Sequence, residues 1–195
     1  MSSSATLQRR PLVKEILKGA DDNLLVIGGL GSSNWDITNA GDRPLNMPLW
    51  GAMGAPLGMG LGLALAQPSK RVLVVTGDGE LLMNIGALAT VAILNPANFS
   101  ILVVDNGHYG ETGWQRSHTS LGVDLEKIAV GSGIQRTRTV STDGEIADGA
   151  RLLREGNGTA FVVLRVAPSE PPAYKRNFDL AACRNRFRGA LLGAG

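Results

Sequence analysis

The sequence predicts an α/β protein built as a three-layer, doubly wound parallel sheet. Short runs rich in β-branched residues alternate along the chain with segments of helical character, and this alternation favours parallel strands joined by helices. Several runs are apolar at every position, as strands are when helices cover both faces of a sheet. A chain of 195 residues suits one such domain. We therefore expect a single domain over residues 1–195, with its core at about 23–167.

The elements follow in order along the chain. Strands are predicted at 23–29, 71–77, 99–105, 137–141 and 159–167, and helices at about 54–66, 81–94, 124–131 and 143–155. Thr142 and Glu145 have the spacing of a capping box at the start of the last of these helices. Residues 1–22 are predicted to contain a leading helix. Residues 168–178 are predicted to form an arm that precedes a final helix.

Composition excludes some classes of function. The net charge is +2, from 19 basic and 17 acidic residues, which is too balanced to indicate binding to nucleic acid or to an anionic membrane. We interpret Arg184, Arg186 and Arg188 as a solvated helix face. The single cysteine, Cys183, excludes an intramolecular disulfide and is predicted to be a small packing residue.

Residues 44–69 carry no charge and raise the question of a membrane span. Prolines and glycines crowd this stretch, and its most regular helical part, about 54–66, is too short to cross a bilayer. A helix that is apolar on all sides also belongs in the interior of a layered α/β protein, and we expect that here. No apolar segment follows the first residues, so no export signal is predicted and the cytoplasm is the expected compartment.

Polar side chains follow two of the predicted strands. Asp78 lies between Gly77 and Gly79 after the strand at 71–77, and Asn106 follows the strand at 99–105. Parallel α/β sheets bind ligands at the carboxyl ends of their strands, and the glycines allow sharp bends and close approach. A helix that opens near Leu81 would direct its free N–H groups to a phosphate. Carboxylate and amide oxygens suit Mg²⁺, so the pattern predicts a metal-bound diphosphate; taken alone, Asp78 could equally be a helix N-cap.

Gly77-Asp78-Gly79 and Asn106, with 26 residues between, resemble the fingerprint of thiamine-diphosphate-dependent enzymes. In that family GDG is followed at a similar distance by Asn-Asn. The resemblance implies that Asp78, Asn106 and the backbone carbonyl of His108 hold Mg²⁺ beside thiamine diphosphate. Asp105 replaces the first Asn of the pattern, but the second Asn is the ligand. Glu80 stands where the family often has Ser; we expect its N–H to serve the phosphate and its carboxylate to turn away.

Two upstream segments extend the resemblance. "WGAMGAPLGMGLGLALA" (50–66) resembles the family's Gly-Ser-Met/Ile-Gly turn and the helix after it, and "GGLGSS" (28–33) its first cofactor loop. Met53 taken alone is better explained as a core residue than as a cofactor wedge, and glycine-rich loops are common in α/β proteins. By resemblance Met53 is the wedge beneath the thiazolium and Gly51 the carbonyl acceptor for the pyrimidine. The implied cofactor residues are Ser32, Ser33, Gly51, Met53, Gly77, Asp78, Gly79, Glu80, Asn106, His108 and Tyr109.

A closer resemblance is to the beta subunits of sulfopyruvate decarboxylase and to the C-terminal part of phosphonopyruvate decarboxylase. It rests on residues 41–54, 105–120 and 122–129. It implies decarboxylation of a 2-oxo acid such as sulfopyruvate, phosphonopyruvate or another 3-substituted pyruvate. His108, His118 and Met53 are the implied catalytic residues, and the implied substrate residues are Thr112, Gln115, Arg116 and His118. A plain solvent-facing loop remains the alternative.

The charges of this loop leave the substrate open. Two histidines and an arginine could hold an anionic group. Glu111 departs from the Ser of the family segment, and its carboxylate would repel a strongly anionic tail. A less charged oxo acid is therefore the alternative substrate.

A partner chain is the last expectation. In the resembled family the glutamate that activates the cofactor lies on a separate pyrimidine-binding domain. Glu80 and Glu111 adjoin the phosphate and substrate loops, on the wrong side of the cofactor. The other five glutamates fall on predicted helices or on the arm, and one domain of this length has no room for a second α/β unit. We expect an alpha subunit that supplies the glutamate, in an α₂β₂ or larger assembly, with the helix at 54–66 close to the contact.

Two other interpretations of the sequence remain. The same cofactor could serve a carboligase, a synthase or an aldehyde-oxidising enzyme. Alternatively, the chain could be a non-catalytic nucleotide-binding module, because strand ends rich in glycine also bind nucleotides.

Overall fold

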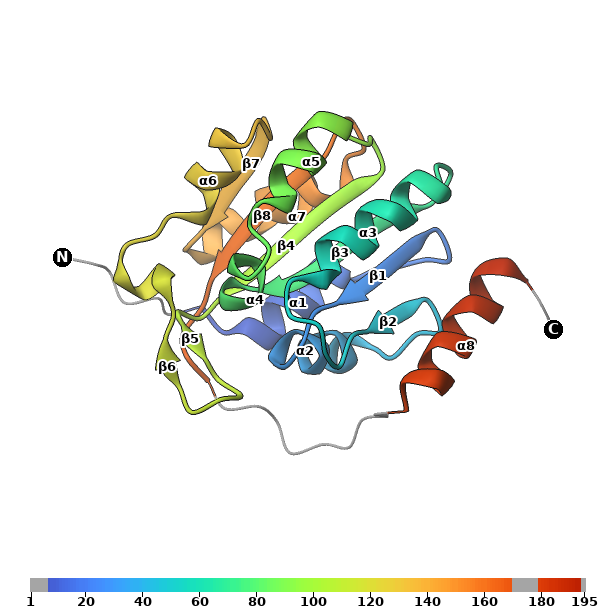
Figure 1. Cartoon of the computed structure of the whole chain (residues 1–195), viewed down its shortest axis with the longest axis horizontal. Coiled ribbons are helices and arrows are strands. Elements are labelled where there is room, and N and C mark those ends of the chain that lie inside the picture. Colours follow the sequence, from blue (N-terminus) through green and yellow to red (C-terminus); the bar gives the residue numbers. More distant parts are fainter. Residues whose placement is uncertain (1–6, 170–178, 194–195) are drawn as a thin grey trace.

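The computed structural model describes residues 7–169 and 179–193. Its centre is a sheet of six parallel strands in the order β2-β1-β3-β4-β8-β7 (Figure 1). The strands are β1 (Leu24–Gly28), β2 (Asn46–Pro48), β3 (Arg71–Gly77), β4 (Phe99–Asp105), β7 (Arg136–Val140) and β8 (Ala160–Arg165). All five predicted strands are present, with bounds that differ by at most two residues. The short strand β2 was not predicted.

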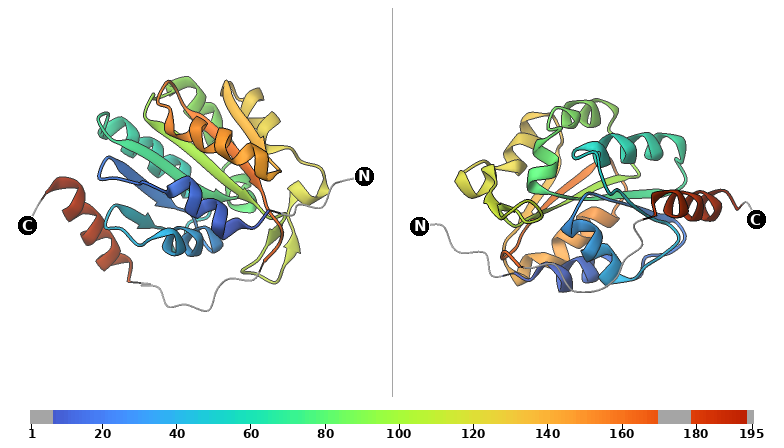
Figure 2. Two further views of the ribbon diagram at one scale, coloured as in Figure 1. Left: turned by 180° about the vertical axis from the view of Figure 1, so that it is seen from behind. Right: turned by 60° about the horizontal axis from the view of Figure 1, so that its bottom comes forward.

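Helices cover both faces of the sheet, which confirms the three-layer architecture. One face carries α3 (Ala55–Ala66), α4 (Asp78–Leu82), α5 (Ala87–Leu94) and α6 (Leu125–Gly131). The other carries α1 (Arg9–Leu17), α2 (Ser32–Ala40) and α7 (Ile146–Arg154), as the view from behind in Figure 2 shows. A last helix, α8 (Leu180–Leu192), packs near β2. Cys183 on α8 is buried, and Arg184, Arg186 and Arg188 are exposed, as predicted.

The apolar strands bury side chains on both faces. On β3, Val72 and Val74 join the hydrophobic cluster beneath α3 and α5, whereas Leu73 and Val75 join the cluster beneath α1 and α7. The other central strands alternate in the same way. Because successive side chains of a strand point to opposite faces, two covered faces require apolar residues at every position.

Two helix predictions need correction. The helix expected at 81–94 is two helices, α4 and α5, separated by residues 83–86; α4 begins at Asp78, immediately after Gly77. The helix at 54–66 is present as α3, but only one side of it is interior. Leu57 and Leu61 are buried, whereas Met59 and Leu65 are exposed by 40% and 51%. The expectation of an all-round buried helix is therefore wrong for the single chain.

Gly60 sets the distance between α3 and the sheet. A Cβ atom at this position would lie 2.3 Å from Cγ2 of Val74 and 3.0 Å from the Phe99 ring. Contacts this short do not occur between real side chains, so α3 can approach the sheet closely only with glycine here.

The two outer strands differ in their surroundings. On β7, the hydroxyls of Thr137 and Thr139 donate to the carboxylate of Glu126 on α6. Arg138 of the same strand pairs with Asp148 on α7 at 3.0 Å. At the opposite edge β2 is short and ends at Pro48. Near it Arg186 of α8 pairs with Asp42, with N–O distances of 2.7 and 2.9 Å.

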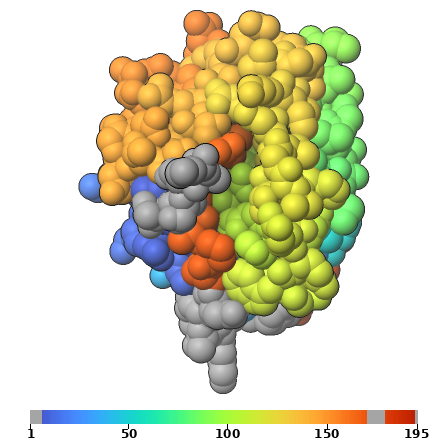
Figure 3. All heavy atoms as spheres, turned by 90° about the vertical axis from the view of Figure 1, so that its left-hand side faces the viewer, coloured from blue at the N-terminus to red at the C-terminus, as the bar shows by residue number. Residues whose placement is uncertain are grey.

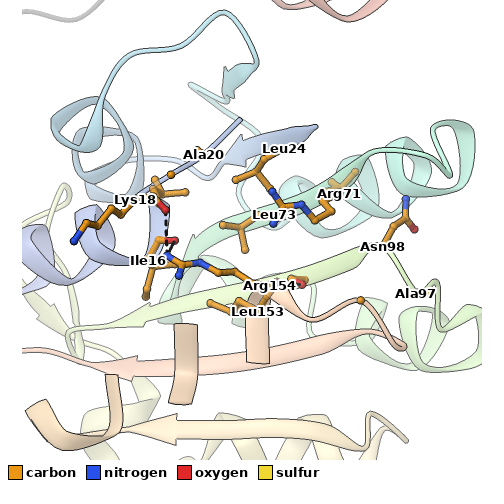
Figure 4. A pocket seen from close by; sticks show the side chains of 15 residues that line it. Ile16, Lys18, Ala20, Leu24, Arg71, Leu73, Ala97, Asn98, Leu153 and Arg154 are labelled. Atoms are coloured by element: carbon orange, nitrogen blue, oxygen red, sulfur yellow. Dashed lines mark hydrogen bonds between the residues drawn. The ribbon is translucent and has the colours of Figure 1, made fainter. Parts of the chain in front are cut away.

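Figure 4 shows a pocket that lies at the amino ends of the strands. Nη2 of Arg154, the last residue of α7, donates to the carbonyls of Glu15, Ile16 and Lys18 at the end of α1, at 3.0–3.2 Å. A mainly apolar cavity of about 210 Å³ lies between these helix ends and the starts of β1 and β3. No helix within residues 7–169 and 179–193 is long and apolar enough to span a bilayer.

Candidate active site

A second cavity, of about 190 Å³, lies at the carboxyl ends of β1, β3 and β4. From β1 the chain passes through α2 on one face of the sheet to the edge strand β2. It then passes through α3 on the other face to β3, which lies on the opposite side of β1 from β2. The winding therefore reverses between these neighbouring strands, the usual place for a ligand in an open α/β sheet. Residues 30–33 after β1, 77–80 after β3, and 106 and 108–112 after β4 line the cavity, together with the apolar side chains of Met53, Met83 and Val104.

Asp78 lies in the wall of this cavity with only 2% of its surface exposed. It is the first residue of α4 and Gly77 is the N-cap, so the N-cap alternative for Asp78 is excluded. Its Oδ2 instead accepts the hydroxyl of Ser117, and Oγ1 of Thr119 lies 3.2 Å from the same oxygen. Burial raises the pKa of Asp78, and the negative charge of Asp105 raises it further, while the two hydroxyls partly offset this.

Asp105, which departs from the family fingerprint, has a structural role at the end of β4. Its Oδ1 accepts the Gly107 N–H at 3.0 Å and the Thr119 hydroxyl at 2.7 Å. Both bonds need only an acceptor oxygen, which an amide would also provide. Asp105 adds a negative charge beside Asp78.

Asn106 and His108 form one local turn. The Asn106 Oδ1 accepts the His108 N–H at 3.0 Å, and the Asn106 carbonyl lies 2.9 Å from the His108 Nδ1. A carbonyl can only accept, so the ring hydrogen is on Nδ1 and, in the neutral ring, Nε2 is the acceptor. The turn holds both residues against the cavity, which they line.

Glu80 joins two of the loops. Its Oε1 accepts the Leu30 N–H at 2.8 Å and its Oε2 accepts the Thr76 hydroxyl at 2.7 Å. The side chain is buried, and burial raises its pKa, although these hydrogen bonds partly offset the shift. The carboxylate oxygens are thus held by the loop after β1 and by β3.

Gly79 and Tyr109 lie in close contact. A Cβ atom on residue 79 would be 2.2 Å from the Tyr109 ring, so glycine is what lets the ring lie over the start of α4. Tyr109 belongs to a two-stranded hairpin of β5 (His108–Tyr109) and β6 (Gln115–Arg116). Within it the rings of His108 and Trp114 are 5.9 Å apart.

The hairpin divides the predicted substrate residues. Thr112 lines the cavity; Gln115, Arg116 and His118 are not among its lining residues. Gln115 bonds back to Thr112, Arg116 donates to Ser120 at 2.7 and 3.2 Å, and His118 is exposed. Figure 3 shows this segment at the surface, in yellow, beside the red-orange end of β8. Their roles stay predictions.

The predicted cofactor residues mostly converge. Ser32, Ser33, Met53, Gly77, Asp78, Gly79, Glu80, Asn106, His108 and Tyr109 all line the cavity, whereas Gly51 lies on the turn before Met53 and does not. Their roles in binding stay predictions, since position alone does not establish contact with a ligand.

Three polar residues at the site, Arg9, Ser117 and Thr119, were not predicted from the sequence. Arg9 lines the cavity and forms a buried ion pair with Asp36 at 2.7 Å. Ser117 and Thr119 bind Asp78 from a loop about forty residues away in sequence. An arginine in a short helix and hydroxyls in a polar loop carry no sequence pattern that would have identified them.

The donors suit a hard cation. No group of three His, Cys, Asp or Glu side chains that could hold a metal occurs in the part of the chain that the structure describes. The available set is one carboxylate, one amide and one carbonyl, from Asp78, Asn106 and His108. Mg²⁺ takes such oxygen ligands and completes its shell with phosphate oxygens and water. These residues therefore fit a metal held together with a diphosphate.

Comparison with known families agrees with this geometry. The model of the family "Thiamine pyrophosphate enzyme, C-terminal TPP binding domain" matches residues 30–164. The chain belongs to this family. The match includes the loops after β1, β3 and β4 that line the cavity. The suspected resemblance and the prediction of a thiamine-diphosphate-binding fold are confirmed.

The relatives matched over most of this chain include decarboxylases and their subunits. The chain is 30% identical to "Sulfopyruvate decarboxylase subunit beta" of Methanococcus maripaludis, over 95% of this chain and 98% of that protein. It is 35% identical to the same subunit of Methanocaldococcus jannaschii, over 70% of this chain and 72% of that protein. It is 32% identical to phosphonopyruvate decarboxylase of Streptomyces viridochromogenes, over 85% of this chain but only 41% of that protein. At this level the prediction of a decarboxylase subunit is confirmed.

A solved structure supports the assignment of the fold. A Mycobacterium smegmatis protein described as a thiamin diphosphate-dependent enzyme superposes with a TM-score of 0.66 at 27% identity. The superposition covers 80% of this chain and 31% of that one. This chain therefore corresponds to about a third of the longer protein.

Proposed function

We propose that this chain is the diphosphate-binding, or beta, subunit of a two-chain thiamine-diphosphate-dependent 2-oxo acid decarboxylase. One observation carries the proposal. Asp78 and Asn106, at the ends of neighbouring strands, line one cavity together with the glycines after β3, in a chain of the thiamine pyrophosphate family.

The residues would divide the binding between metal and cofactor. Asp78, Asn106 and the His108 carbonyl would hold Mg²⁺, and the backbone of Gly77, Gly79 and Glu80 would face the diphosphate. Met53, partly exposed in the cavity wall, would support the cofactor rings. When bound, thiamine diphosphate supplies a carbanion that adds to a ketone and an electron sink for the decarboxylated group.

We propose His108 as the residue that exchanges a proton near the substrate. Its Nδ1–H is directed to the Asn106 carbonyl, so Nε2 is the atom that can accept or return a proton. The Trp114 ring beside it restricts the space around the imidazole.

The substrate is proposed as a 3-substituted pyruvate, the class to which the substrates named for the relatives belong. Glu111 favours a second candidate. It lines the same cavity, and a carboxylate near the substrate tail disfavours a second negative charge. An oxo acid with a less charged tail is therefore the alternative.

The alpha subunit is proposed to cover the α3–α5 face. Met59 and Leu65 of α3, Met83 after α4, and Ile93 and Leu94 of α5 are exposed apolar side chains. Large exposed apolar surfaces indicate protein contacts. Two relatives are named as beta subunits, which supports a partner that supplies the activating glutamate, in an α₂β₂ or larger assembly.

The test is purification of the full chain alone and together with a co-expressed pyrimidine-domain subunit. CO₂ release is measured from a panel of 2-oxo acids with Mg²⁺ and thiamine diphosphate, with Asp78→Ala as the control. We expect turnover only with both subunits and intact Asp78. Turnover by the lone chain would contradict the two-chain model. Product analysis distinguishes simple decarboxylation from ligation or oxidation, and tighter binding of ADP or NAD than of thiamine diphosphate would favour a nucleotide-binding module.

A further inference from the structure

Four buried or partly buried oxygen groups meet behind the cavity wall. Ser117, which is fully buried, donates its hydroxyl to Oδ2 of Asp78. Oγ1 of Thr119 lies 3.2 Å from that same Oδ2, 2.7 Å from Oδ1 of Asp105 and 2.9 Å from Oγ of Ser117. Ser117 donates its hydrogen to Oδ2 of Asp78, whereas the single hydroxyl hydrogen of Thr119 is directed to the nearer Asp105, so that Thr119 bridges the two carboxylates. Neither hydroxyl is bonded to Oδ1 of Asp78 in the described part of the chain.

In the absence of a bound cation, this arrangement of carboxylates lowers the stability of the fold. Asp78 and Asp105 are two nearly buried carboxylates linked by one threonine hydroxyl. Within residues 7–169 and 179–193, no lysine or arginine forms an ion pair with either of them. Buried carboxylates without a counter-charge lower stability. A cation bound at Asp78 would supply that counter-charge.

The same serine closes the base of the hairpin. The Ser117 N–H donates to the Gly107 carbonyl at 2.8 Å, which joins the segment after β6 to the segment before β5. The hydroxyl of Ser117 therefore ties this base to Asp78 at the end of β3. His108 and Tyr109 lie on the hairpin that is held in this way.

We propose that Ser117 and Thr119 are positioning residues that act through Asp78. The Ser117 hydroxyl holds Oδ2 and the Thr119 hydroxyl bridges Asp78 to Asp105, so that Oδ1 is the single metal-binding oxygen, and they couple metal binding to the placement of the β5–β6 hairpin over the cavity. The inference rests on the proposed function, in which Asp78 is the metal ligand. By linkage, a change that frees the hairpin from Asp78 also weakens the metal.

Variants of the loop test the coupling with the full chain. Ser117→Ala and Thr119→Val each remove one hydroxyl, and Thr119→Ser retains it. Ser120→Ala is the matched control, because among the described residues the Ser120 hydroxyl bonds to the Ser117 carbonyl and to Arg116 and not to either carboxylate. Mn²⁺ serves as a paramagnetic probe in the presence of thiamine diphosphate, and free Mn²⁺ is measured by electron paramagnetic resonance.

We expect Ser117→Ala and Thr119→Val to weaken Mn²⁺ binding by about 10- to 100-fold, the usual effect of removing a partner that orients a metal ligand. Thr119→Ser and Ser120→Ala should keep the parent affinity. Hydrogen exchange of residues 107–116 should slow when Mn²⁺ and thiamine diphosphate bind to the parent chain, but not when they are added to Ser117→Ala. Thermal unfolding without metal confirms that each variant is folded, and Thr119→Val carries the test if Ser117→Ala is not.

The outcomes separate the two hypotheses. If the parent chain binds no Mn²⁺ in the presence of thiamine diphosphate, the proposed function is wrong. If the parent binds Mn²⁺ and the two hydroxyl-removing variants match Ser120→Ala in affinity and exchange, the function stands and the positioning role is wrong. A weakened affinity that Thr119→Ser does not retain would also contradict a role for the hydroxyl.

Discussion

Asp78 shows how a ligand-binding residue can oppose the stability of the chain that carries it. Burial and the neighbouring charge of Asp105 raise its pKa above the ordinary value of 3.8. A group with a raised folded-state pKa favours folding when it is protonated. That contribution is fully present below the unfolded pKa and is lost as the pH rises through the folded pKa. At neutral pH the ionised carboxylate therefore destabilises the metal-free chain.

Asp78→Asn should stabilise the metal-free chain at about pH 7, because the amide carries no charge and still accepts the Ser117 hydroxyl. The melting temperature should rise by about 2–4 °C for each kcal/mol relieved. The gain should be smaller at a lower pH, because a carboxyl group with a raised pKa becomes protonated before an ordinary one as the pH falls. Thermal unfolding at both pH values checks this. A lower melting temperature of the variant at neutral pH would show that the carboxylate is not a source of instability.

At the scale of elements, α3 contacts the sheet through a glycine on one side and carries glycines in open space on the other. Gly60→Ala should destabilise the chain by about 1–3 kcal/mol, because the added methyl overlaps Val74. Gly58→Ala is the matched control: no atom outside the helix lies within 4 Å of a Cβ there, and alanine favours the helix by about 1 kcal/mol. Urea unfolding should move the two midpoints in opposite directions. Equal shifts would contradict the close packing of Gly60.

The outward side of α3 should matter for assembly and not for folding. Met59→Glu should leave the melting temperature of the lone chain nearly unchanged, because the side chain is already exposed. It should weaken association with the pyrimidine-domain subunit, since a charge would be buried without a partner. Leu180→Glu on α8, which is similarly exposed, serves as the control. Co-purification with the partner measures the effect, and unchanged association would place the contact elsewhere.

Elements with a regular apolar pattern were predictable, and those that depend on tertiary contacts were not. The strands follow from their apolar runs, and the capping box of Thr142 and Glu145 is present as predicted. Helix α2 was missed because its buried positions include Asn34 and Asp36. These polar residues are held by Leu49 and Arg9, from distant segments. No periodicity within the helix records such contacts.

At the scale of the whole molecule, topology explains which site residues could be predicted. Asp78 and Asn106 follow adjacent parallel strands, so their proximity follows from the order of the sheet. The positions of Gln115, Arg116 and His118 depend instead on the turn of the hairpin, where Trp114 adopts a positive φ of 61°. That conformation is rare for a bulky side chain and is not apparent from the sequence.

A substitution at the amino ends of the strands should change stability without changing metal binding at the carboxyl ends. Arg154→Met removes the guanidinium that holds the last carbonyls of α1, and it should lower stability by about 1–3 kcal/mol. It should leave Mn²⁺ affinity unchanged, because the cavity with Asp78 lies at the opposite ends of the strands. Unfolding and metal titration of the same sample measure both quantities. A loss of metal affinity in the folded variant would reveal coupling across the sheet.

The outer strands determine how this protein can associate with other chains. An open strand edge with free N–H and C=O groups is a template for aggregation. On β7, arginines alternate with threonines bonded to Glu126, and β2 is only three residues long and ends in proline. Such edges resist extension by a further strand, because charge and proline both oppose pairing. Encounters between copies or partners are thereby directed away from the sheet and towards helical surfaces, where contact does not begin a fibre.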